Sequence, residues 1–349
     1  MRRENVPAGM ICSFPWLRTP YMALLRYGLM FPRLERAWNR LDSAAYAEFV
    51  AKRLEATDVF HGLSGHNLKP GLLAKERGGS YVCDRGSSHI VYQDRIMREE
   101  GERMGVPVEP IDAVAIESEL AEYSACDRIF VASSFARRTF IEAGIAPDKL
   151  WSLPYGTSLE HWGPIPVAAD GKFRVVYAGS LSLRKGVGDL LAAFERAALP
   201  NSEVVLIGGR SAESDRLLKP YRQVPNTIIT GQLPQPKMRE WFARSSVFVL
   251  PSIEDGFGLV IMEAQACGLP VIATVNTGGP DVIDDGRNGF VVPIRSPDAI
   301  AEKLAFLYAN PDQLRAMREE SLLTAKNSRG WDAFAQGMLE LYGELRNGS

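Results

Sequence analysis

Residues 251–274 have the sequence PSIEDGFGLVIMEAQACGLPVIAT. This stretch predicts a strand that ends at Pro251 and a glycine-rich turn that leads into a helix beginning near Gly258. Gly268 followed by Pro270 marks the end of that helix, because glycine closes the last turn and proline cannot continue it. VIAT, at the end of the stretch, predicts the next strand. The stretch therefore predicts one strand, helix and strand unit.

The same alternation of short apolar runs and amphipathic stretches extends in both directions. From about residue 55 it passes through TDVFHGLSG, NLKPGLLAKERG, SYVCDRG, IDAVAIESELAEYSACD and RIFVAS, and it restarts after residue 171 with FRVVYAG, VGDLLAAFERAAL, SEVVLIGG, NTIITG and SVFVLPS. Such alternation predicts parallel βαβ units with helices on both faces of a sheet. Functional residues are then expected in the loops after strands.

A segment with three prolines and three glycines, WSLPYGTSLEHWGPIPVAADGK, separates the two runs. We therefore predict two Rossmann-like, doubly wound parallel-sheet domains, an N-terminal one over residues 1–165 and a C-terminal one over 171–328. Residues 329–349 are expected to form a helix that packs back on the N-terminal domain. Open sheets of this kind bind ligands beyond the carboxyl ends of their strands, so the cleft between the domains is the expected active site.

Size and composition narrow the class of protein. The 349 residues exceed what one hydrophobic core usually supports, and a net charge of -2 argues against a nucleic-acid partner, whose binding domains usually carry a basic excess. The four cysteines form no CxxC pair, and no membrane-spanning apolar run or signal-peptide pattern is evident. These features predict a cytoplasmic protein.

Residues 14–38, FPWLRTPYMALLRYGLMFPRLERAW, leave two interpretations open. Their aromatic residues, leucines and arginines compose a surface that can rest on anionic lipid, which would place the protein peripherally at the inner face of a membrane. We favour the alternative, in which the apolar side chains pack in the N-terminal domain. Prolines at 15, 20 and 32 interrupt any long amphipathic helix.

The glycine-rich turn carries the clearest chemistry. Gly256 and Gly258 let backbone N–H groups approach a ligand closely, and the helix N-terminus adds partial positive charge, so a phosphate can bind there. Glu263, about a turn and a half inside the helix, would repel that phosphate and must face hydrogen-bond donors instead. The two hydroxyls of a ribose suit a carboxylate, so the combination implies a nucleotide.

The phrase EDGFGLVIMEAQACGLPVI resembles the signature of glycosyltransferase family 4, in which an acidic residue, seven further residues and a glutamate lie within EGFGLxxxEAxAxGxPVI. The resemblance implies a GT-B fold and a nucleotide-sugar donor. Glu263 would bind the ribose of that donor. The turn amides at Gly258, Leu259 and Val260 would bind its diphosphate, and Asp255 would contact the hydroxyls of its sugar.

The sequence departs from the family at Asp255, where the family has glutamate. Aspartate is one methylene shorter, so either Asp255 accepts from a sugar that lies slightly closer or the neighbouring Glu254 turns in instead. We favour Asp255. Gly256 and Phe257 complete the expected donor-binding turn.

A second phrase, YAGSLSLRKGVGDLLAAF, resembles the family segment G-R-L-x-x-x-K-G. Lys185 would neutralise the donor diphosphate and the charge that develops on it as it departs, the role of a metal ion in many other transferases. Gly179 belongs to the same site, Ser180 replaces the family arginine, and Arg184 is able to substitute for it. The alternative is that Arg184 and Lys185 are an ordinary solvated pair. No DxD-type metal pair is evident, so neither a metal nor another cofactor is expected.

Shorter matches cover the rest of the second domain. IGG contains Gly208, and the family turn that corresponds to Gly231 and Leu233 packs near the base of the donor. The loop at Thr277–Gly279 corresponds to one that faces the donor sugar. All of these glycines could equally be simple turn residues.

Polar residues in the N-terminal half are expected on the acceptor side. His61, His66 and His89 fall in loops after predicted strands, where catalytic residues concentrate, although a loop histidine is more often structural or solvated. His89 is predicted to be catalytic and Asp84 and Arg85 to contact the acceptor, because the DRG segment occupies the place of a family loop near the donor sugar.

The resemblance in this half is looser and begins at about Asp58. The family's first strand and glycine-rich turn, which approaches the donor phosphates, has no clear counterpart before that residue. Either the chain begins late or residues 1–50 rebuild the region differently.

The resemblance implies transfer with retention of anomeric configuration, in which the acceptor attacks from the face that the diphosphate leaves. Lys185, Asp255, Glu263 and His89 are the expected catalytic residues. The expected donor is a UDP- or GDP-sugar, and the expected acceptor is a glycan, a lipid-linked molecule or a small molecule, as in polysaccharide biosynthesis.

Two rival functions remain. Epimerases and phosphorylases share the fold, but the EDGFG phrase opposes them. A nucleotide-sugar-binding protein without turnover is motivated by Ser180, by Asp255 and by the unusual N-terminus.

Overall fold

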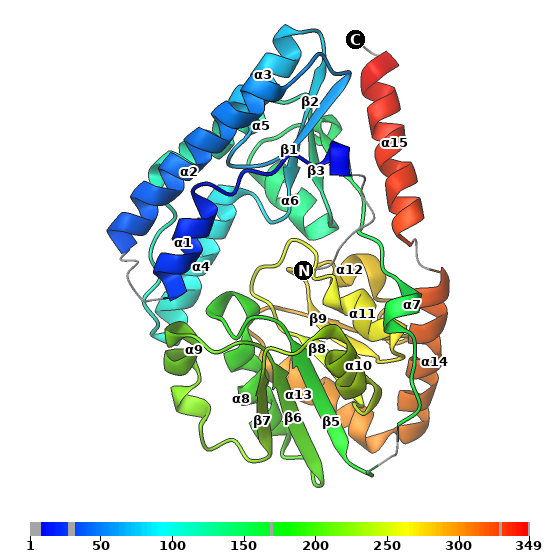
Figure 1. Cartoon of the computed structure of the whole chain (residues 1–349). Coiled ribbons are helices and arrows are strands. Elements are labelled where there is room, and N and C mark those ends of the chain that lie inside the picture. The colour runs from blue at the N-terminus through cyan, green and yellow to red at the C-terminus, as the bar shows by residue number, and fades with distance from the viewer. Residues whose placement is uncertain (1–7, 27–31, 168–169, 328–329, 348–349) are drawn as a thin grey trace. The chain divides into compact units, whose positions relative to one another are not determined.

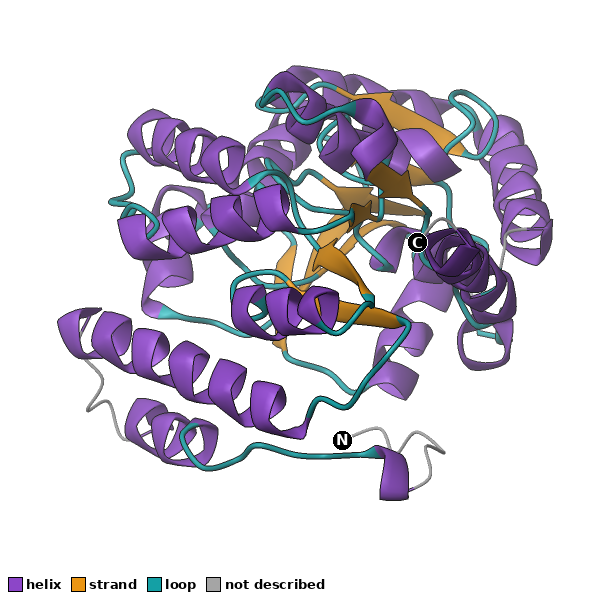
Figure 2. Cartoon of the chain, turned by 90° about the horizontal axis from the view of Figure 1, so that it is seen from above, coloured by secondary structure: helices purple, strands orange, loops and turns teal. Residues whose placement is uncertain are grey.

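The computed structural model describes residues 8–26, 32–167, 170–327 and 330–347. They form two parallel sheets with helices on both sides of the strands (Figures 1 and 2). The chain divides into two compact units, one made of Met1–Asp84, Ile111–Arg128 and Leu345–Ser349 and the other of Arg85–Pro110 and Ile129–Glu344. Segments 85–110 and 129–165 thus group with the second sheet, which differs from the predicted division near residue 165.

The first sheet has four strands in consecutive order, β1-β2-β3-β4. β1 pairs with β2 and β3 with β4, both in parallel. The strands are β1 (Val59–Leu63), β2 (Ser80–Arg85), β3 (Arg128–Val131) and β4 (Leu150–Ser152), and the intervening helices are α3 (Leu68–Glu76), α4 (Ile90–Met104), α5 (Ala113–Ala125), α6 (Ser134–Glu142) and the short η2 (Pro147–Lys149). The consecutive order means that these four strands contain no reversal of winding.

The described residues before β1 form helices and no strand: η1 (Ala8–Met10), α1 (Arg18–Arg26) and α2 (Pro32–Arg53). Pro20 lies in the first turn of α1 and Pro32 begins α2, positions that tolerate proline because the first N–H groups of a helix have no intrahelical partner. The prolines therefore divide this region into two helices. The favoured interpretation of core packing holds for Tyr21, which is buried, and not for Trp16 or Met22, which are exposed.

The second sheet has six parallel strands in the order β10-β9-β8-β5-β6-β7. Taken in chain order this is the doubly wound arrangement 3-2-1-4-5-6, in which the winding reverses between β5 and β8. The predicted doubly wound fold is confirmed for this sheet. Its strands are β5 (Phe173–Ala178), β6 (Ser202–Ile207), β7 (Thr227–Gly231), β8 (Val247–Leu250), β9 (Val271–Thr274) and β10 (Gly289–Val292).

Apolar side chains explain why this sheet forms. Every residue of β5, β6, β8 and β9 is buried, and near-continuous apolar strands such as VFVL are what a parallel sheet covered on both faces requires. One core joins the strands to their helices. Those helices are α7 (Leu159–Trp162), α8 (Val187–Ala197), η4 (Lys219–Tyr221), α10 (Gln235–Ala243), α11 (Val260–Ala266), α12 (Gly279–Val282), α13 (Pro297–Ala309) and α14 (Pro311–Asn327). Two further helices, η3 (Leu183–Lys185) and α9 (Ala212–Leu217), contribute Leu183 and Leu217 to a separate small cluster with Val106.

The helix predicted between Gly258 and Gly268 is α11, and its end is confirmed by Gly268, which has φ +76°. The helix begins two residues later than predicted because Gly258 has φ +81°, outside the helical region. Glu263 is consequently in the first turn of α11.

The last helix, α15 (Trp331–Asn347), packs beside β3 and the segment after β4. Phe334 contacts the rings of Phe130 and Tyr155, with centroids 5.9 Å and 5.6 Å apart. None of the helices formed by the described residues is both long enough and apolar enough to cross a membrane.

Gly186 should be irreplaceable. It has φ +65°, and a Cβ there would lie 1.9 Å from the carbonyl oxygen of Pro251. Because that oxygen belongs to a buried backbone, Gly186→Ala should lower the free energy of unfolding by about 3 kcal/mol. Gly105→Ala is the matched control, since Gly105 has φ +63° and open space around it, and should cost only about 1 kcal/mol. Urea unfolding of both variants measures the difference, and equal losses would show that the contact with Pro251 contributes nothing.

Candidate functional site

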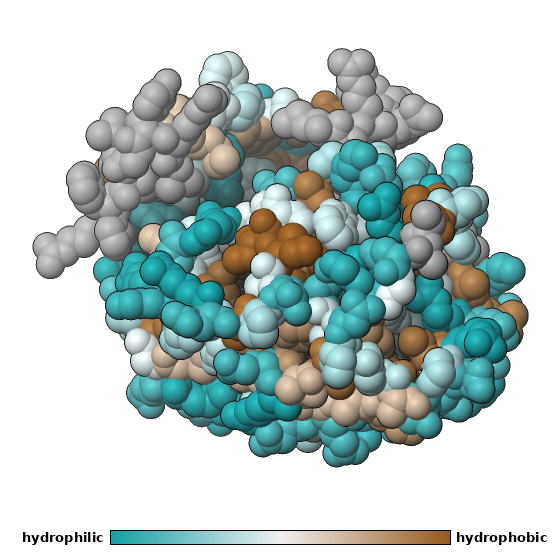
Figure 3. Space-filling view, turned by 90° about the horizontal axis from the view of Figure 1, so that it is seen from below, coloured by the Kyte–Doolittle hydropathy of each residue, from teal (hydrophilic) through white to brown (hydrophobic). Residues whose placement is uncertain are grey.

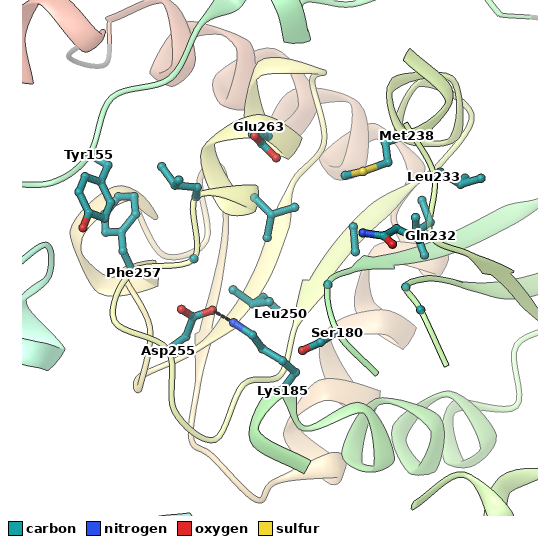
Figure 4. A pocket seen from close by; sticks show the side chains of 18 of the residues that line it. Tyr155, Ser180, Lys185, Gln232, Leu233, Met238, Leu250, Asp255, Phe257 and Glu263 are labelled. Atoms are coloured by element: carbon teal, nitrogen blue, oxygen red, sulfur yellow. Dashed lines mark hydrogen bonds and ion pairs between the residues drawn. The ribbon is translucent and has the colours of Figure 1, made fainter. Parts of the chain in front are cut away.

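A cavity of about 760 Å³ lies at the carboxyl ends of the second sheet (Figure 4). The loops after β5, β6, β7 and β8 supply its walls, on either side of the point where the winding reverses, which is where sheets of this type bind ligands. It is lined by Gly86, Tyr155, Ala178, Gly179, Ser180, Lys185, Ile207, Gly208, Gly209, Arg210, Gln232, Leu233, Met238, Leu250, Asp255, Phe257, Gly258, Leu259, Val260 and Glu263.

Lys185 and Asp255 form an ion pair on the cavity wall, in which Nζ donates to Oδ2. Both side chains are largely buried, at 14% and 13% exposure. The backbone fixes this pairing, because the carbonyl oxygen of Arg184 accepts hydrogen bonds from the N–H groups of Ile253 (2.9 Å) and Glu254 (3.3 Å). The turn that carries Lys185 is thereby bound to the loop that carries Asp255.

Glu254 points away from the cavity into a fully buried site. One oxygen accepts from Ser87 Oγ (2.5 Å), Ser88 N (3.0 Å) and Ser88 Oγ (2.8 Å), and the other from Gln93 Nε2 (3.2 Å) and Arg184 Nη1 (3.1 Å). Burial favours the neutral acid, but the positive charge of Arg184 and the serine hydrogen bonds outweigh it and lower the pKa of Glu254. Of the two acids considered for the donor sugar, only Asp255 lines the cavity.

Gly256 serves a close approach of two backbone segments rather than lining the cavity. A Cβ on Gly256 would lie 2.1 Å from the carbonyl oxygen of Gly86, and Ser133 Oγ donates to the carbonyl oxygen of Gly256 at 2.6 Å. From the sequence, we expected Gly256 to let the backbone approach a phosphate. In the structure, the close neighbour of Gly256 is the backbone at Gly86, and Gly86 itself lines the cavity.

Glu263 and the residues at the start of α11 form another wall. Figure 4 shows Glu263 on a different side of the cavity from the Lys185–Asp255 pair, with Gln232, Leu233 and Met238 forming a further side. The cavity therefore offers a cation beside a carboxylate, a separate carboxylate, and a partly apolar wall that includes an amide.

The structure brings together most of the predicted donor-binding residues. Those that line the cavity are Gly179, Ser180, Lys185, Gly208, Leu233, Asp255, Phe257, Gly258, Leu259, Val260 and Glu263. Arg184, Glu254 and Gly256 lie behind the wall, as does Gly231, whose carbonyl oxygen accepts from Gly208 N at 3.1 Å.

Sequence reasoning missed several residues of the cavity. Arg210 directly follows the IGG phrase and Gln232 lies between two predicted site residues, so both could have been found by extending those loops. Gly86 adjoins Arg85 in the DRG segment. Tyr155 and Met238 had no comparable signal, because one lies in the predicted linker and the other on α10.

His89 caps a helix and does not line the cavity. Its Nδ1 accepts from Val91 N (3.3 Å) at the start of α4, and its N–H donates to Thr139 Oγ1 (2.9 Å). Burial, aided by the nearby charge of Arg85, lowers the pKa of His89 to about 4. Its position gives no support to the predicted catalytic role.

The predicted acceptor-side residues also lie outside the cavity lining. His61 Nε2 lies 3.4 Å from Asp84 Oδ2 on neighbouring strands β1 and β2, and the ring of His66 lies edge-on to Tyr46. Arg85 donates to Ser88 O (3.0 Å) and Gln93 Oε1 (2.8 Å), so it orients two partners of Glu254. Acceptor contacts by these residues stay a prediction.

Solved structures of other proteins identify the fold. The chain is similar to sucrose-phosphate synthase from Thermosynechococcus elongatus (TM-score 0.72, 23% identity, covering 92% of this chain and 82% of that one). It is also similar to Anabaena HepE in complex with UDP-glucose (TM-score 0.68, 15% identity, 86% and 82% covered). The two parallel-sheet α/β domains are therefore those of a GT-B fold.

The sequence is similar to known glycosyltransferases over part of its length. Residues 161–322 match the family model of glycosyl transferases group 1. D-inositol 3-phosphate glycosyltransferase of Xylanimonas cellulosilytica is 30% identical over 219 residues, which cover 56% of this chain and 52% of that relative. The chain thus spans about half the length of the curated relatives that it first matches.

Protonation of His89 should destabilise the fold. The pKa of His89 is about 4 in the folded protein and 6.5 in the unfolded chain, so the unfolded chain binds the proton more tightly. The free energy of unfolding should therefore fall as the pH drops from 6.5 towards 4. His89→Asn keeps a capping side chain and should remove about 2 kcal/mol of that pH-dependent loss. Thermal unfolding of the wild type and of His89→Asn between pH 7 and pH 4 measures this pH-dependent loss of stability. Transfer by the variant should remain within about threefold of wild type at pH 7, and a loss of 100-fold or more would restore the catalytic role.

Proposed function

We propose that this chain transfers a sugar from a UDP- or GDP-sugar to a hydroxyl group of a glycan, lipid-linked or small-molecule acceptor, with retention of anomeric configuration. The supporting observation is that Lys185, Asp255 and Glu263 line one cavity at the winding reversal of the second sheet. The likeness to HepE, whose solved structure contains UDP-glucose, supports a nucleotide-sugar donor. The motifs that resemble family 4 support retention.

The cavity walls suit the parts of such a donor. Lys185 would neutralise the diphosphate, and Asp255 beside it would accept hydrogen bonds from sugar hydroxyls. Glu263, on another wall, would accept from the ribose hydroxyls. Gln232, Leu233 and Met238 provide apolar contact and one amide for the base.

The proposed reaction needs no carboxylate nucleophile. The acceptor oxygen forms a bond to the anomeric carbon while the bond from that carbon to the diphosphate oxygen breaks, and the departing diphosphate takes the hydroxyl proton. Lys185 stabilises the charge that develops on the diphosphate. We propose that no metal is required, so EDTA should leave transfer unchanged.

A nucleotide-sugar-binding protein without turnover is the second candidate. The observation in its favour is Ser180, which lines the cavity where the family has arginine and which contacts Ser182 Oγ at 3.1 Å. Arg210, paired with Asp215, supplies a cation to the cavity from the loop after β6. Turnover therefore has to be measured separately from binding.

Donor selectivity tests the proposal first. UDP-, GDP-, ADP- and dTDP-sugars are titrated by thermal shift against the wild type, where one base should stabilise the fold in proportion to ligand concentration. Glu263→Ala should weaken that binding about tenfold or more, because two charge-assisted hydrogen bonds are lost. Binding with neither hydrolysis nor transfer to a broad acceptor panel would establish the second candidate. No binding by any nucleotide would overturn both.

Variants of Asp255 and Lys185 should affect donor binding and sugar transfer to different extents. Asp255→Asn should leave UDP affinity unchanged or raise it severalfold, because Lys185 loses a competing carboxylate, while transfer falls about 100-fold. Lys185→Gln should lower both, with UDP affinity down about tenfold or more. Calorimetry with UDP and a transfer assay measure the two effects, and Lys237→Gln, at an exposed pair with Glu240, is the matched control. UDP binding weakened equally in both site variants would contradict these roles.

A further inference from the structure

The charged side chains that line the cavity balance one another. Among the described residues of the lining, Lys185 and Arg210 are cationic, and Asp255 and Glu263 are acidic. Lys185 already pairs with Asp255 on the cavity wall. A diphosphate group carries negative charge on each of its phosphates, and a cation paired with a carboxylate offers it no net positive charge. Arg210 is therefore the cation that the cavity has in reserve for such a group.

The loop after β6 that carries Arg210 touches the loop after β5 that leads to Lys185. A Cβ on Gly208 would lie 2.0 Å from the carbonyl oxygen of Gly179. The N–H of Gly179 donates to the carbonyl oxygen of Ile207 at 2.9 Å. The two loops thus meet through their backbones, and both contribute to the cavity lining. Their two cations belong to one wall region that the sheet itself holds together.

Directly after Arg210, a capping box at the start of α9 fixes the backbone. Ser211 Oγ accepts from Ser214 N at 3.1 Å, and Ser214 Oγ accepts from Ser211 N at 2.7 Å. The guanidinium of Arg210 pairs with Asp215 in the first turn of the same helix, where Nε donates to Oδ1 at 2.9 Å. Asp215 does not line the cavity. The arginine therefore stands at the cavity edge, held by an acid that lies outside it.

The pair between Arg210 and Asp215 is open to solvent, since the two side chains are 56% and 50% exposed. Solvent screens such a pair, which contributes little to stability, so Arg210 can exchange Asp215 for a more highly charged acceptor. Hydrophilic residues cover much of the face that Figure 3 shows, so exposure alone does not distinguish this arginine. Its place in the lining of a cavity does.

We propose that Arg210 is a second cation for the donor diphosphate and that Asp215 competes with the donor for it. Lys185 would act from the turn after β5 and Arg210 from the loop after β6. On binding, the guanidinium would leave Asp215 and donate to phosphate oxygens, which its planar fork fits in bidentate fashion. This inference rests on the proposed function, and it adds to the donor site a residue that lies outside the motifs from which that site was predicted.

Calorimetric titration of the full chain with UDP and with GDP tests the inference on whichever of the two the wild type binds. Arg210→Gln should weaken that binding about tenfold or more, because charge-assisted hydrogen bonds to phosphate are lost. It should also reduce the weakening of binding that the wild type shows as salt rises from about 0.1 to 0.5 M. Asp215→Asn should strengthen binding about twofold to threefold at low salt, because the competing carboxylate is removed.

A second exposed ion pair supplies the matched controls. Arg196 on α8 pairs with Asp298 on α13, with side chains that are 49% and 83% exposed, and neither residue lines the cavity. Arg196→Gln and Asp298→Asn make the same changes of charge as the two site variants and should bind nucleotide like the wild type. Circular dichroism and urea unfolding of all four variants show whether each is folded.

The inference and the proposed function fail in different ways. If the wild type binds nucleotide and Arg210→Gln binds it as Arg196→Gln does, the inference is overturned and the proposed function stands. Equal weakening by Arg210→Gln and Asp215→Asn would also overturn the inference, because the pair would then act only by shaping the loop. A wild type that binds neither UDP nor GDP would overturn the proposed function, and the role of Arg210 with it.

Discussion

The ion pair between Arg184 and the fully buried Glu254 joins the two chain segments on which the cavity depends. Its side chains meet at 3.1 Å, and the backbone of Arg184 accepts two hydrogen bonds from the loop at Ile253–Glu254. Breaking such a pair leaves an uncompensated charge in a buried place, so the contact strongly favours one arrangement of the two loops. Lys185 and Asp255, each the next residue along its segment, are aligned as a consequence. Close packing reinforces this alignment, because neither Gly186 nor Gly256 leaves room for a Cβ.

Two adjacent carboxylates therefore have opposite tasks. Glu254 is held by four other residues and has no exposure, which suits a structural charge, whereas Asp255 lies on the cavity wall opposite a single lysine. A diphosphate that entered would compete with Asp255 for Lys185, and the displaced carboxylate would then be available to sugar hydroxyls. In the proposed function, the Lys185–Asp255 pair would thus hold the cavity wall in shape and would exchange partners with the donor.

The second sheet and the preference for Asp255 over Glu254 could be predicted from the sequence, but the structural role of Glu254 could not. Buried parallel strands are continuous apolar runs, and Gly258 and Gly268 mark the ends of α11 by their positive φ, so both features are local and visible in the sequence. The choice between Glu254 and Asp255 depends on Ser87 and Ser88, which are more than 160 residues away in the sequence. The capping role of His89 could not be predicted from the sequence either, because histidines that cap helices and catalytic histidines both occur in loops after strands. Tyr155 and Met238 belong to no sequence pattern, and only the folded structure places them in the cavity.

In the first sheet, the turn between β1 and α3 already holds a carboxylate of the protein. After β1, the N–H groups of Gly65, Asn67 and Leu68 point to the carboxylate of Glu122 at 2.7 Å, 2.7 Å and 3.0 Å, at the start of α3. Burial raises the pKa of Glu122 despite these hydrogen bonds, so the carboxylate is held there at some cost. The protein's own acid thus occupies the helix N-terminus that could otherwise have bound a phosphate. In the proposed function, a donor diphosphate would therefore be neutralised in the cavity of the second sheet, where Lys185 lies on a turn that is hydrogen-bonded through its backbone to the loop at Ile253–Glu254.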